Sequence, residues 1–377
     1  MIRSVTTRET CCSKRSPGGD EFMVLAKVAS PEDAKLVAEN IFKSLQEDVI
    51  VEHHNLHVTA SIGIALYPQD GTDIATLIKN ADMALYRVKE SGRKNYQLYS
   101  RDMHTEARER MQLENELRGA VERRELELYY QPIVDVRSGR IMGAEALVRW
   151  HHPTRGFLAP SQFIPLAEET GAIFPIGDWV FDAACSQLRQ WHDAGFPGLT
   201  LGVNFSPQQL MRRNLIAKIG AVLTTAGLPP GSVALELTEN IAIRGIKPAL
   251  AMLKELRALG LGLVLDDFGM GHSSLGYLKQ FAITGLKIDQ TFVRRSLTDR
   301  EDAAVIKAII LLATTLELGL VAEGIETEAE KQFLLDAGCH LMQGYLFSPP
   351  VPAGEFEKLL TSPVTPHTLK YSPKKFD

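Results

Sequence analysis

The stretch Leu261–Gly269, LGLVLDDFG, decides the fold class of this chain. A nearly continuous apolar run is typical of a strand that helices cover on both faces of a parallel sheet. Seven further runs of this kind lie between Leu126 and Phe347, and helical stretches such as Lys247–Gly260 separate them. Eight such strands in roughly 240 residues predict an α/β fold of the (β/α)₈ barrel type. An open doubly wound sheet is the alternative, but no Gly-rich phosphate loop opens a first helix.

Polar residues stand at or near the end of each predicted strand. In a (β/α)₈ barrel the carboxyl ends of all strands meet on one face, where active sites lie. One acidic residue after a strand is usually a helix cap or a solvated loop residue, but that interpretation does not explain a whole set. The set comprises Gln131, Glu145, Asn204, Glu236, Asp266, Asp267, Lys287, Asp289, Glu323 and Gln343.

The chemistry of this set favours a metal site. Carboxylates that face one another repel, and a bound divalent cation is the simplest way to neutralise their charge. Oxygen ligands without His or Cys suit Mg²⁺ or Mn²⁺ better than zinc. The adjacent Asp266 and Asp267 could together bind two ions, and a pair of metal ions is used for phosphodiester hydrolysis. Lys287 then supplies a fixed positive charge near the developing phosphorane or the attacking water.

Seven blocks, in order along residues 114–360, resemble the EAL-domain phosphodiesterases. They read GAEALVRW, VNFSPQQL, ELTEN, LDDFGMGHSSLGYL, LKIDQTFV, AEGIET and MQGYLFSPP. The resemblance implies a (β/α)₈ barrel, often dimeric. It also implies hydrolysis of cyclic di-GMP to linear 5′-pGpG by a two-metal mechanism with Mg²⁺ or Mn²⁺, in bacterial second-messenger signalling.

The same resemblance implies a role for each site residue. One metal ion would be held by Glu145, Asn204, Glu236 and Asp266, and the second held or flanked by Asp266, Asp267 and Glu323. Lys287 would orient the metal-bridging water, and Glu323 is the candidate general base. The implied substrate contacts are Gln131, Arg149 on a phosphate, Asp289, and Tyr345 beside a guanine. The implied supporting residues are Glu326, Gln343, and Glu239, which would anchor the loop after Asp267.

Two departures from the family pattern lie in that loop, where Met270 and His272 replace the more usual Thr and Tyr. Neither position is a metal ligand, and both are expected to pack. The pair His151 and His152 has no partner spacing for a metal site, and a surface loop is the expected placement.

The blocks SPGGDEF, SIGIALYPQDG and NADMALYRVKESGRKNY resemble the second half of a GGDEF diguanylate cyclase domain. This resemblance gives Glu21 a metal or catalytic role and Lys89 and Arg93 phosphate contacts. The family's first strand, with a metal-binding Asp, precedes that hairpin. Residues 1–17 show no strand period and do not resemble that part. We therefore predict a truncated GGDEF domain without cyclase activity.

The expected domain boundaries follow from these blocks. Residues 1–99 form the truncated GGDEF domain, 100–118 a linker helix, 119–361 the EAL barrel and 362–377 a C-terminal tail. A solvated surface helix is an equal alternative for residues 100–118, which are highly charged.

Composition sets the remaining expectations. The 377 residues carry a net charge of −5, which gives no reason to expect a nucleic-acid polymer or an anionic membrane as partner. The 4 cysteines form no Cys-x-x-Cys pair, and no apolar run is long enough to span a membrane. A cytoplasmic setting is expected, although an upstream region could tether the natural protein to a membrane. A non-catalytic cyclic di-GMP receptor, a cyclase and a two-carboxylate glycosidase are the rival functions.

Overall fold

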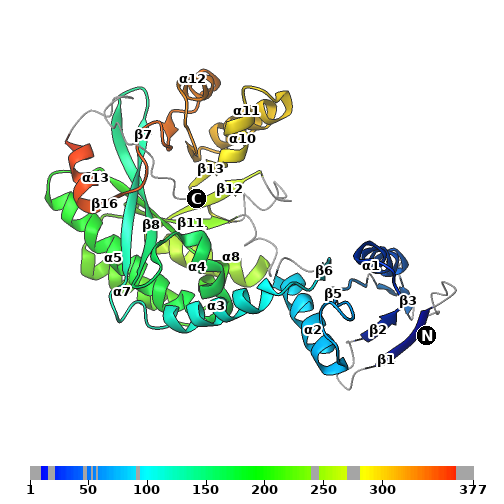
Figure 1. Cartoon of the computed structure of the whole chain (residues 1–377). Coiled ribbons are helices and arrows are strands. Elements are labelled where there is room, and N and C mark those ends of the chain that lie inside the picture. The colour runs from blue at the N-terminus through cyan, green and yellow to red at the C-terminus, as the bar shows by residue number, and fades with distance from the viewer. Residues whose placement is uncertain are drawn as a thin grey trace. The chain divides into compact units, whose positions relative to one another are not determined.

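A computed structural model of the chain describes residues 10–15, 22–45, 49–51, 54–56, 58–90, 94–238, 246–269 and 281–361 (Figure 1). The chain divides into two compact units, Met1–Leu113 and Glu114–Asp377, which we describe separately. Among the helices in the described ranges, none combines the length and apolar character needed to cross a membrane.

Within its described residues, the first unit contains two complete helices, the start of a third and short paired strands. The helix α1 (Pro31–Leu45) begins at Ser30 as predicted, because the Ser30 Oγ accepts a hydrogen bond from the Asp33 N–H at 3.2 Å. The second helix is α2 (Ile74–Glu90). The strands are β1 (Thr10–Arg15), β2 (Phe22–Ala26), β3 (Val49–Val51), β4 (His54–Leu56), β5 (Ile62–Ile64) and β6 (Tyr96–Leu98).

The expectation that residues 1–17 lack a strand is wrong. The strand β1 pairs antiparallel with β2, and the backbone ladder between them forms although the β1 side chains show no apolar alternation. Two further sheets pair β3 with β4 and β5 with β6. Lys89 lies in the last turn of α2, whereas Glu21 and Arg93 lie outside the described residues. The helix α3 (Asp102–Leu117) covers most of the predicted linker helix.

The second unit contains the predicted barrel. Its eight strands are hydrogen-bonded in the closed order β7-β15-β14-β13-β12-β11-β10-β8, and β8 returns to β7. The (β/α)₈ class is therefore confirmed. The strands are β7 (Leu126–Asp135), β8 (Arg140–His152), β10 (Thr200–Asn204), β11 (Val233–Thr238), β12 (Gly262–Phe268), β13 (Gly285–Ile288), β14 (Gly319–Ala322) and β15 (Leu341–Met342).

The barrel strand β7 is antiparallel to its neighbours, whereas the sequence predicted parallel strands throughout. The strand β7 is antiparallel to both β8 and β15. Only four residues separate β7 from β8, and a parallel connection needs about a dozen or more. The turn is closed by the Gly139 N–H, which donates to the Asp135 carbonyl oxygen at 2.8 Å, and Gly139 has φ +67°. Gln131 therefore lies in the middle of β7, and its partner Glu145 lies inside β8, so neither stands at the end of its strand as expected.

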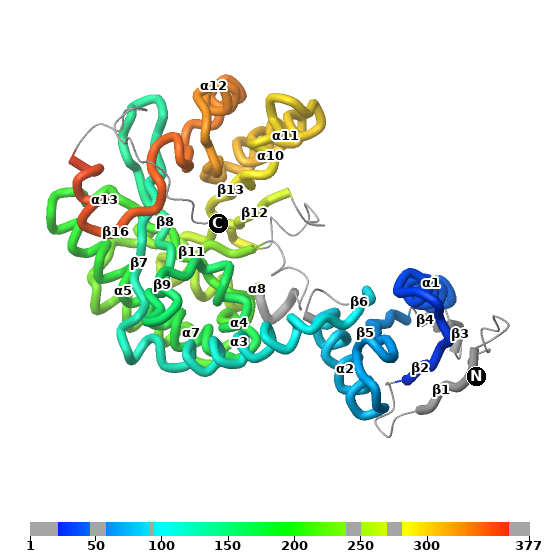
Figure 2. Tube along the Cα trace, in the orientation of Figure 1, coloured from blue at the N-terminus to red at the C-terminus, as the bar shows by residue number. Residues whose placement is uncertain are grey.

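Helices cover the outside of the barrel (Figure 2). Tyr130 of β7, Trp191 and Phe356 form an aromatic contact in which the ring centroids of Trp191 lie 4.7 Å from Tyr130 and 4.8 Å from Phe356. This contact packs the helix α13 (Ala353–Leu360) against β7. The helices are α4 (Pro160–Thr170), α5 (Ile173–Asp193), α6 (Pro207–Leu210), α7 (Leu215–Ala226), α8 (Ile246–Ala258), α10 (Gln290–Arg295), α11 (Arg300–Thr315), α12 (Glu328–Ala337) and α13 (Ala353–Leu360); the short strands are β9 (Gly156–Leu158) and β16 (Val351–Pro352).

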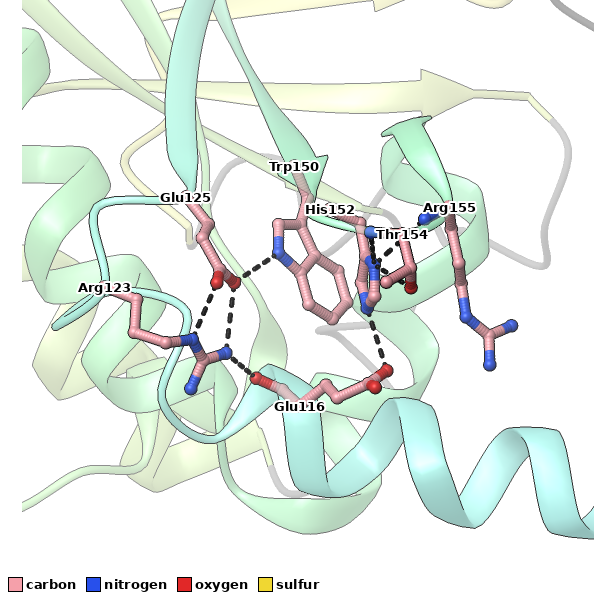
Figure 3. A network of polar contacts seen from close by, with 7 residues as sticks. All are labelled: Glu116, Arg123, Glu125, Trp150, His152, Thr154 and Arg155. Carbon is pink, nitrogen blue, oxygen red and sulfur yellow. Dashed lines mark hydrogen bonds and ion pairs between the residues drawn. The ribbon is translucent and has the colours of Figure 1, made fainter.

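The expectation that His151 and His152 lie in a surface loop is wrong, because both belong to β8 and His152 is buried. Its Nδ1 accepts hydrogen bonds from the backbone N–H groups of Thr154 and Arg155, each at 3.2 Å. We therefore assign the ring proton to Nε2, which donates to Glu116 Oε2 at 2.8 Å. Figure 3 shows this network.

A second link joins the same strand to the chain after α3. Trp150 Nε1 donates to Glu125 Oε2 at 3.0 Å, and Arg123 Nε donates to Glu125 Oε1 at 2.6 Å. Arg123 also donates to the backbone carbonyl oxygen of Glu116 (Figure 3). The outward face of β8 is therefore fixed to the last turn of α3 by the buried rings of Trp150 and His152 and by partly exposed charged groups.

Replacing His152 with alanine should lower the free energy of unfolding by about 2–4 kcal/mol, because it opens a cavity, removes the acceptor of two backbone N–H groups and removes one donor to Glu116. Urea denaturation measures this loss. The matched control is His151→Ala, at the exposed neighbouring position, which should cost less than about 1 kcal/mol. Equal losses in the two variants would contradict the role of the buried ring.

Candidate active site at the carboxyl ends of the strands

Lys287 lies at the centre of the site. It belongs to β13, every residue of which is buried, and its side chain is 1% exposed. Its Nζ lies 3.0 Å from Glu145 Oε2, 2.8 Å from Glu236 Oε2, 2.5 Å from Glu323 Oε1 and 3.7 Å from Asp266 Oδ1. Four strands of the barrel, together with Glu323 directly after β14, thus bring one ammonium group and four carboxylates together.

Glu145 is the most connected carboxylate of this cluster. Asn204 Nδ2 donates to Glu145 Oε1 at 2.6 Å, and Gln343 Nε2 donates to Glu145 Oε2 at 2.7 Å. Gln343 Nε2 also donates to Gln131 Oε1 at 2.9 Å, while Gln131 Nε2 donates to the Ser348 carbonyl oxygen at 3.1 Å. The predicted residues from β7, β8, β10 and the end of β15 therefore form one connected set.

Gly202 is a functional residue that the sequence reasoning missed. It lies on β10, next to β11, and a Cβ atom at this position would lie 2.0 Å from Glu236 Oε1. The missing side chain makes room for the Glu236 carboxylate. A glycine inside an apolar strand is the signal that could have indicated this close approach.

The two neighbouring aspartates adopt different backbone conformations. Asp266 is in extended strand, whereas Asp267 has φ +53°, in the left-handed region that Asp tolerates better than most residues. Asp266 Oδ1 accepts a hydrogen bond from the Asp267 N–H at 3.0 Å. Asp289 caps α10 by accepting from the Thr291 N–H at 2.7 Å, and its side chain interacts with Asp267.

Most of these carboxyl groups have raised pKa values. Burial raises the pKa of Glu323 to about 8 and that of Asp267 to about 6, and Asp266 adds to both shifts. Burial likewise raises the pKa of Glu236 and Asp266, with repulsion from Glu145 as a further cause. Burial also opposes the charged form of Glu145, but Lys287 and the two amides outweigh it and lower its pKa.

These shifts predict how stability depends on pH without a bound cation. A carboxyl whose pKa is higher in the folded state binds its proton more tightly there, so its stabilising contribution is lost as pH rises through the folded pKa. For Glu323 the window runs from the ordinary value of 4.5 to about 8. Urea denaturation in EDTA should show lower stability at about pH 8.5 than at about pH 5.5, by on the order of 2–4 kcal/mol. The Glu323→Gln variant should reduce this difference; a wild-type difference of zero would contradict the shifts.

The donor set fits a hard divalent cation. Because Asn204 gives its amide N–H to Glu145, its carbonyl oxygen is the atom left for a cation. The buried carboxylates outnumber Lys287, and their raised pKa values indicate a need for more positive charge. In the part of the chain that the structure describes, no three His, Cys, Asp or Glu side chains are arranged as a metal site, and Lys287 lies among the carboxylates.

The remaining predicted residues lie outside the central cluster or outside the described part. The Glu326 carboxylate accepts from Arg294 at 2.8 Å and is half exposed, so the structure does not bring it to Glu145 or Lys287. Tyr345 is 67% exposed. Arg149 lies on β8 within electrostatic range of Glu145 and Tyr345. Glu239, Met270 and His272 are not among the described residues.

The fold and site define an α/β-barrel protein with an acidic, lysine-centred site at the carboxyl ends of its strands. The profile of the EAL domain matches residues 114–350, which is more than half of the chain. This chain therefore belongs to the EAL domain family, as the sequence blocks predicted. The profile described as diguanylate cyclase, GGDEF domain matches residues 4–95, which confirms the second resemblance and shows that it extends further toward the N-terminus than expected.

Characterised relatives and a solved structure are similar to this chain. The bifunctional diguanylate cyclase/cyclic di-GMP phosphodiesterase MucR of Pseudomonas aeruginosa is 44% identical over 345 residues, 92% of this chain and 50% of that protein. The cyclic di-GMP phosphodiesterase NbdA of the same species is 40% identical over 342 residues, 91% of this chain and 44% of that protein. The chain thus spans about half the length of the curated relatives it matches. The solved PaMucR phosphodiesterase in complex with c-di-GMP is 45% identical, with a TM-score of 0.63, over 65% of this chain and 99% of that one.

Proposed function

We propose that the barrel hydrolyses cyclic di-GMP to linear 5′-pGpG. The observation that carries this proposal is the buried Lys287 among Glu145, Glu236, Asp266 and Glu323 at the carboxyl ends of the strands. Two relatives that match this chain are cyclic di-GMP phosphodiesterases by name, and the solved PaMucR phosphodiesterase holds c-di-GMP. A site with only two carboxylates would serve a glycosidase, but it leaves Lys287 and Asn204 without a role.

The reaction breaks one phosphodiester bond. The oxygen of a water molecule bonds to phosphorus, and the bond between phosphorus and the ribose O3′ breaks. The water gives up one proton and O3′ takes one, so the products are a 5′-phosphate and a 3′-hydroxyl on one linear dinucleotide. Charge that accumulates on the phosphate oxygens must be stabilised in the transition state.

Mg²⁺ or Mn²⁺, when bound, would supply positive charge to the scissile phosphate and to the attacking water. The residues that would hold two such ions are Glu145, Asn204, Glu236, Asp266, Asp267 and Glu323.

The chain's own residues do the remaining work. Lys287 stays protonated, because four carboxylates raise its pKa despite burial, and it orients the attacking water. Glu323 accepts the proton of that water once added positive charge favours its carboxylate form. Gln343 fixes Glu145 and Gln131 in place. Gln131, Arg149, Asp289 and Tyr345 are proposed substrate contacts.

Hydrolysis in H₂¹⁸O tests this reaction. Mass spectrometry should find a single ¹⁸O in the 5′-phosphate of pGpG and none in the 3′-hydroxyl. A product labelled at the ribose oxygen, or a product other than pGpG, would contradict the proposed attack on phosphorus. The absence of a cyclase activity and the formation of a dimer stay predictions.

A further inference from the structure

Arg149 has an unusual environment for a half-buried cation. Its NH1 group donates to the Val148 carbonyl oxygen at 3.0 Å, and its guanidinium carbon lies 5.7 Å from the centroid of the Tyr129 ring. Among the described residues no carboxylate lies within 4.0 Å of it. A guanidinium has five N–H donors, so most remain for a ligand.

The nearest candidate partner of Arg149 is held by another residue. Glu127 lies directly opposite Arg149 in the β7–β8 pairing, where an ion pair would be expected. Instead Glu127 Oε2 lies 2.6 Å from His151 Nε2. His151 thus keeps the carboxylate across the strands occupied.

The Tyr129 ring that contacts Arg149 is itself packed against further aromatic rings. The Tyr129 ring meets the Phe157 ring edge to face with centroids 5.5 Å apart, and Phe157 meets His151 in the same way at 5.3 Å. Phe157 of β9 is paired with His151 of β8 in register. The three rings form a small platform, defined as Tyr129, His151 and Phe157, and the guanidinium lies over its Tyr129 ring.

Alternation along the strand places this platform on the side of the active site. Glu145, Arg149 and His151 are separated by even numbers of residues on β8, so they point to one face. Arg149 lies four residues from Glu145, or about 13 Å along an ideal strand. That separation suits a ligand with a second phosphate beyond the reacting one.

We propose that Tyr129 and His151 are positioning residues that keep Arg149 fixed and unpaired for a phosphate of the dinucleotide substrate. This inference rests on the proposed function. An arginine already paired with Glu127 would have to give up that pair before binding an anion, whereas a preorganised and unpaired one does not. The Tyr129 ring supports the Arg149 guanidinium, and His151 binds the Glu127 carboxylate that would otherwise pair with Arg149.

The test of His151 uses the variant His151→Phe, which keeps a ring on Phe157 but loses the nitrogen that holds Glu127. The Kd for cyclic di-GMP, measured calorimetrically with Ca²⁺ in place of Mg²⁺ or Mn²⁺, should rise about three- to tenfold. Adding Glu127→Gln should restore the wild-type Kd within about twofold, and Glu127→Gln alone should not weaken binding. A purely structural role of His151 would not be rescued in this way.

The test of Tyr129 separates KM from kcat. Tyr129→Leu should raise KM about three- to tenfold with kcat almost unchanged, and Tyr129→Phe should keep KM near the wild-type value because the ring remains. In the background of Arg149→Met, Tyr129→Leu should have no further effect.

Three results would overturn the inference: no rescue by Glu127→Gln, a Tyr129→Leu effect that persists without Arg149, or a wild-type chain that does not bind cyclic di-GMP. Binding without hydrolysis, together with the expected Kd changes, would instead contradict only the proposed reaction. Normal hydrolysis with unchanged constants in all variants would contradict only this inference.

Discussion

The Glu145→Gln variant should lose about 10²–10³-fold in kcat for cyclic di-GMP hydrolysis while remaining folded. Glutamine preserves the size of the side chain but removes the negative charge that Lys287 contacts at 3.0 Å. In the wild type the two Glu145 oxygens accept hydrogen bonds from Asn204 and Gln343. The glutamine side chain has a single acceptor oxygen, so it cannot accept both bonds. The proposed cation site would lose a charged ligand. Initial rates of pGpG formation, read by chromatography, measure the effect.

The matched control for this variant is Glu127→Gln on the adjacent strand. It makes the same chemical change at a carboxylate that is 46% exposed and contacts His151 rather than Lys287. Its kcat should stay within about twofold of wild type. Thermal unfolding of both variants checks that each chain is folded. Wild-type turnover by Glu145→Gln would contradict the assignment of the site.

The Lys287→Met variant should lose a comparable factor of about 10²–10³ in kcat and should also be less stable without metal. Methionine fills much of the same volume but leaves Glu145, Glu236 and Glu323 without their shared cation. Removing one partner of a buried ion pair costs about 3–5 kcal/mol. Urea denaturation in EDTA measures the stability loss, and steady-state rates measure kcat.

Added Mn²⁺ should recover part of the stability of Lys287→Met but not its turnover. A divalent cation would replace the lost positive charge, whereas it cannot replace a group that orients the attacking water. The matched control is Lys254→Met on the surface helix α8, which should change neither quantity measurably. Full activity in Lys287→Met would show that the lysine only balances charge.

Much of the fold and the cluster could be predicted from the sequence, because both depend on the order of strands. Apolar runs that end in Asn204, Glu236 or Lys287 converge once they form parallel strands of one barrel. The barrel and the EAL family are confirmed by the strand order and the family match. The metal-binding and catalytic roles of these residues stay predictions.

One missed feature depends on a local turn, and the others depend on contacts between residues far apart in the chain. The direction of β7 follows from a turn of four residues, a signal that was present in VDVRSGRI but not used. The burial of His152 depends on Glu116, 36 residues earlier in the chain. The clearance that Gly202 gives Glu236 depends on the register of two strands. Apolar periodicity describes one segment at a time and contains none of this information.

The most direct test of the central claim is incubation of the purified chain with cyclic di-GMP and Mg²⁺ or Mn²⁺, followed by chromatography for 5′-pGpG. A parallel reaction contains EDTA, and another contains the Glu145→Gln variant. We predict product in the metal-containing wild-type reaction and almost none in the other two. Cyclic di-GMP that binds tightly to the metal-loaded wild-type chain but stays intact would contradict the account and indicate a receptor.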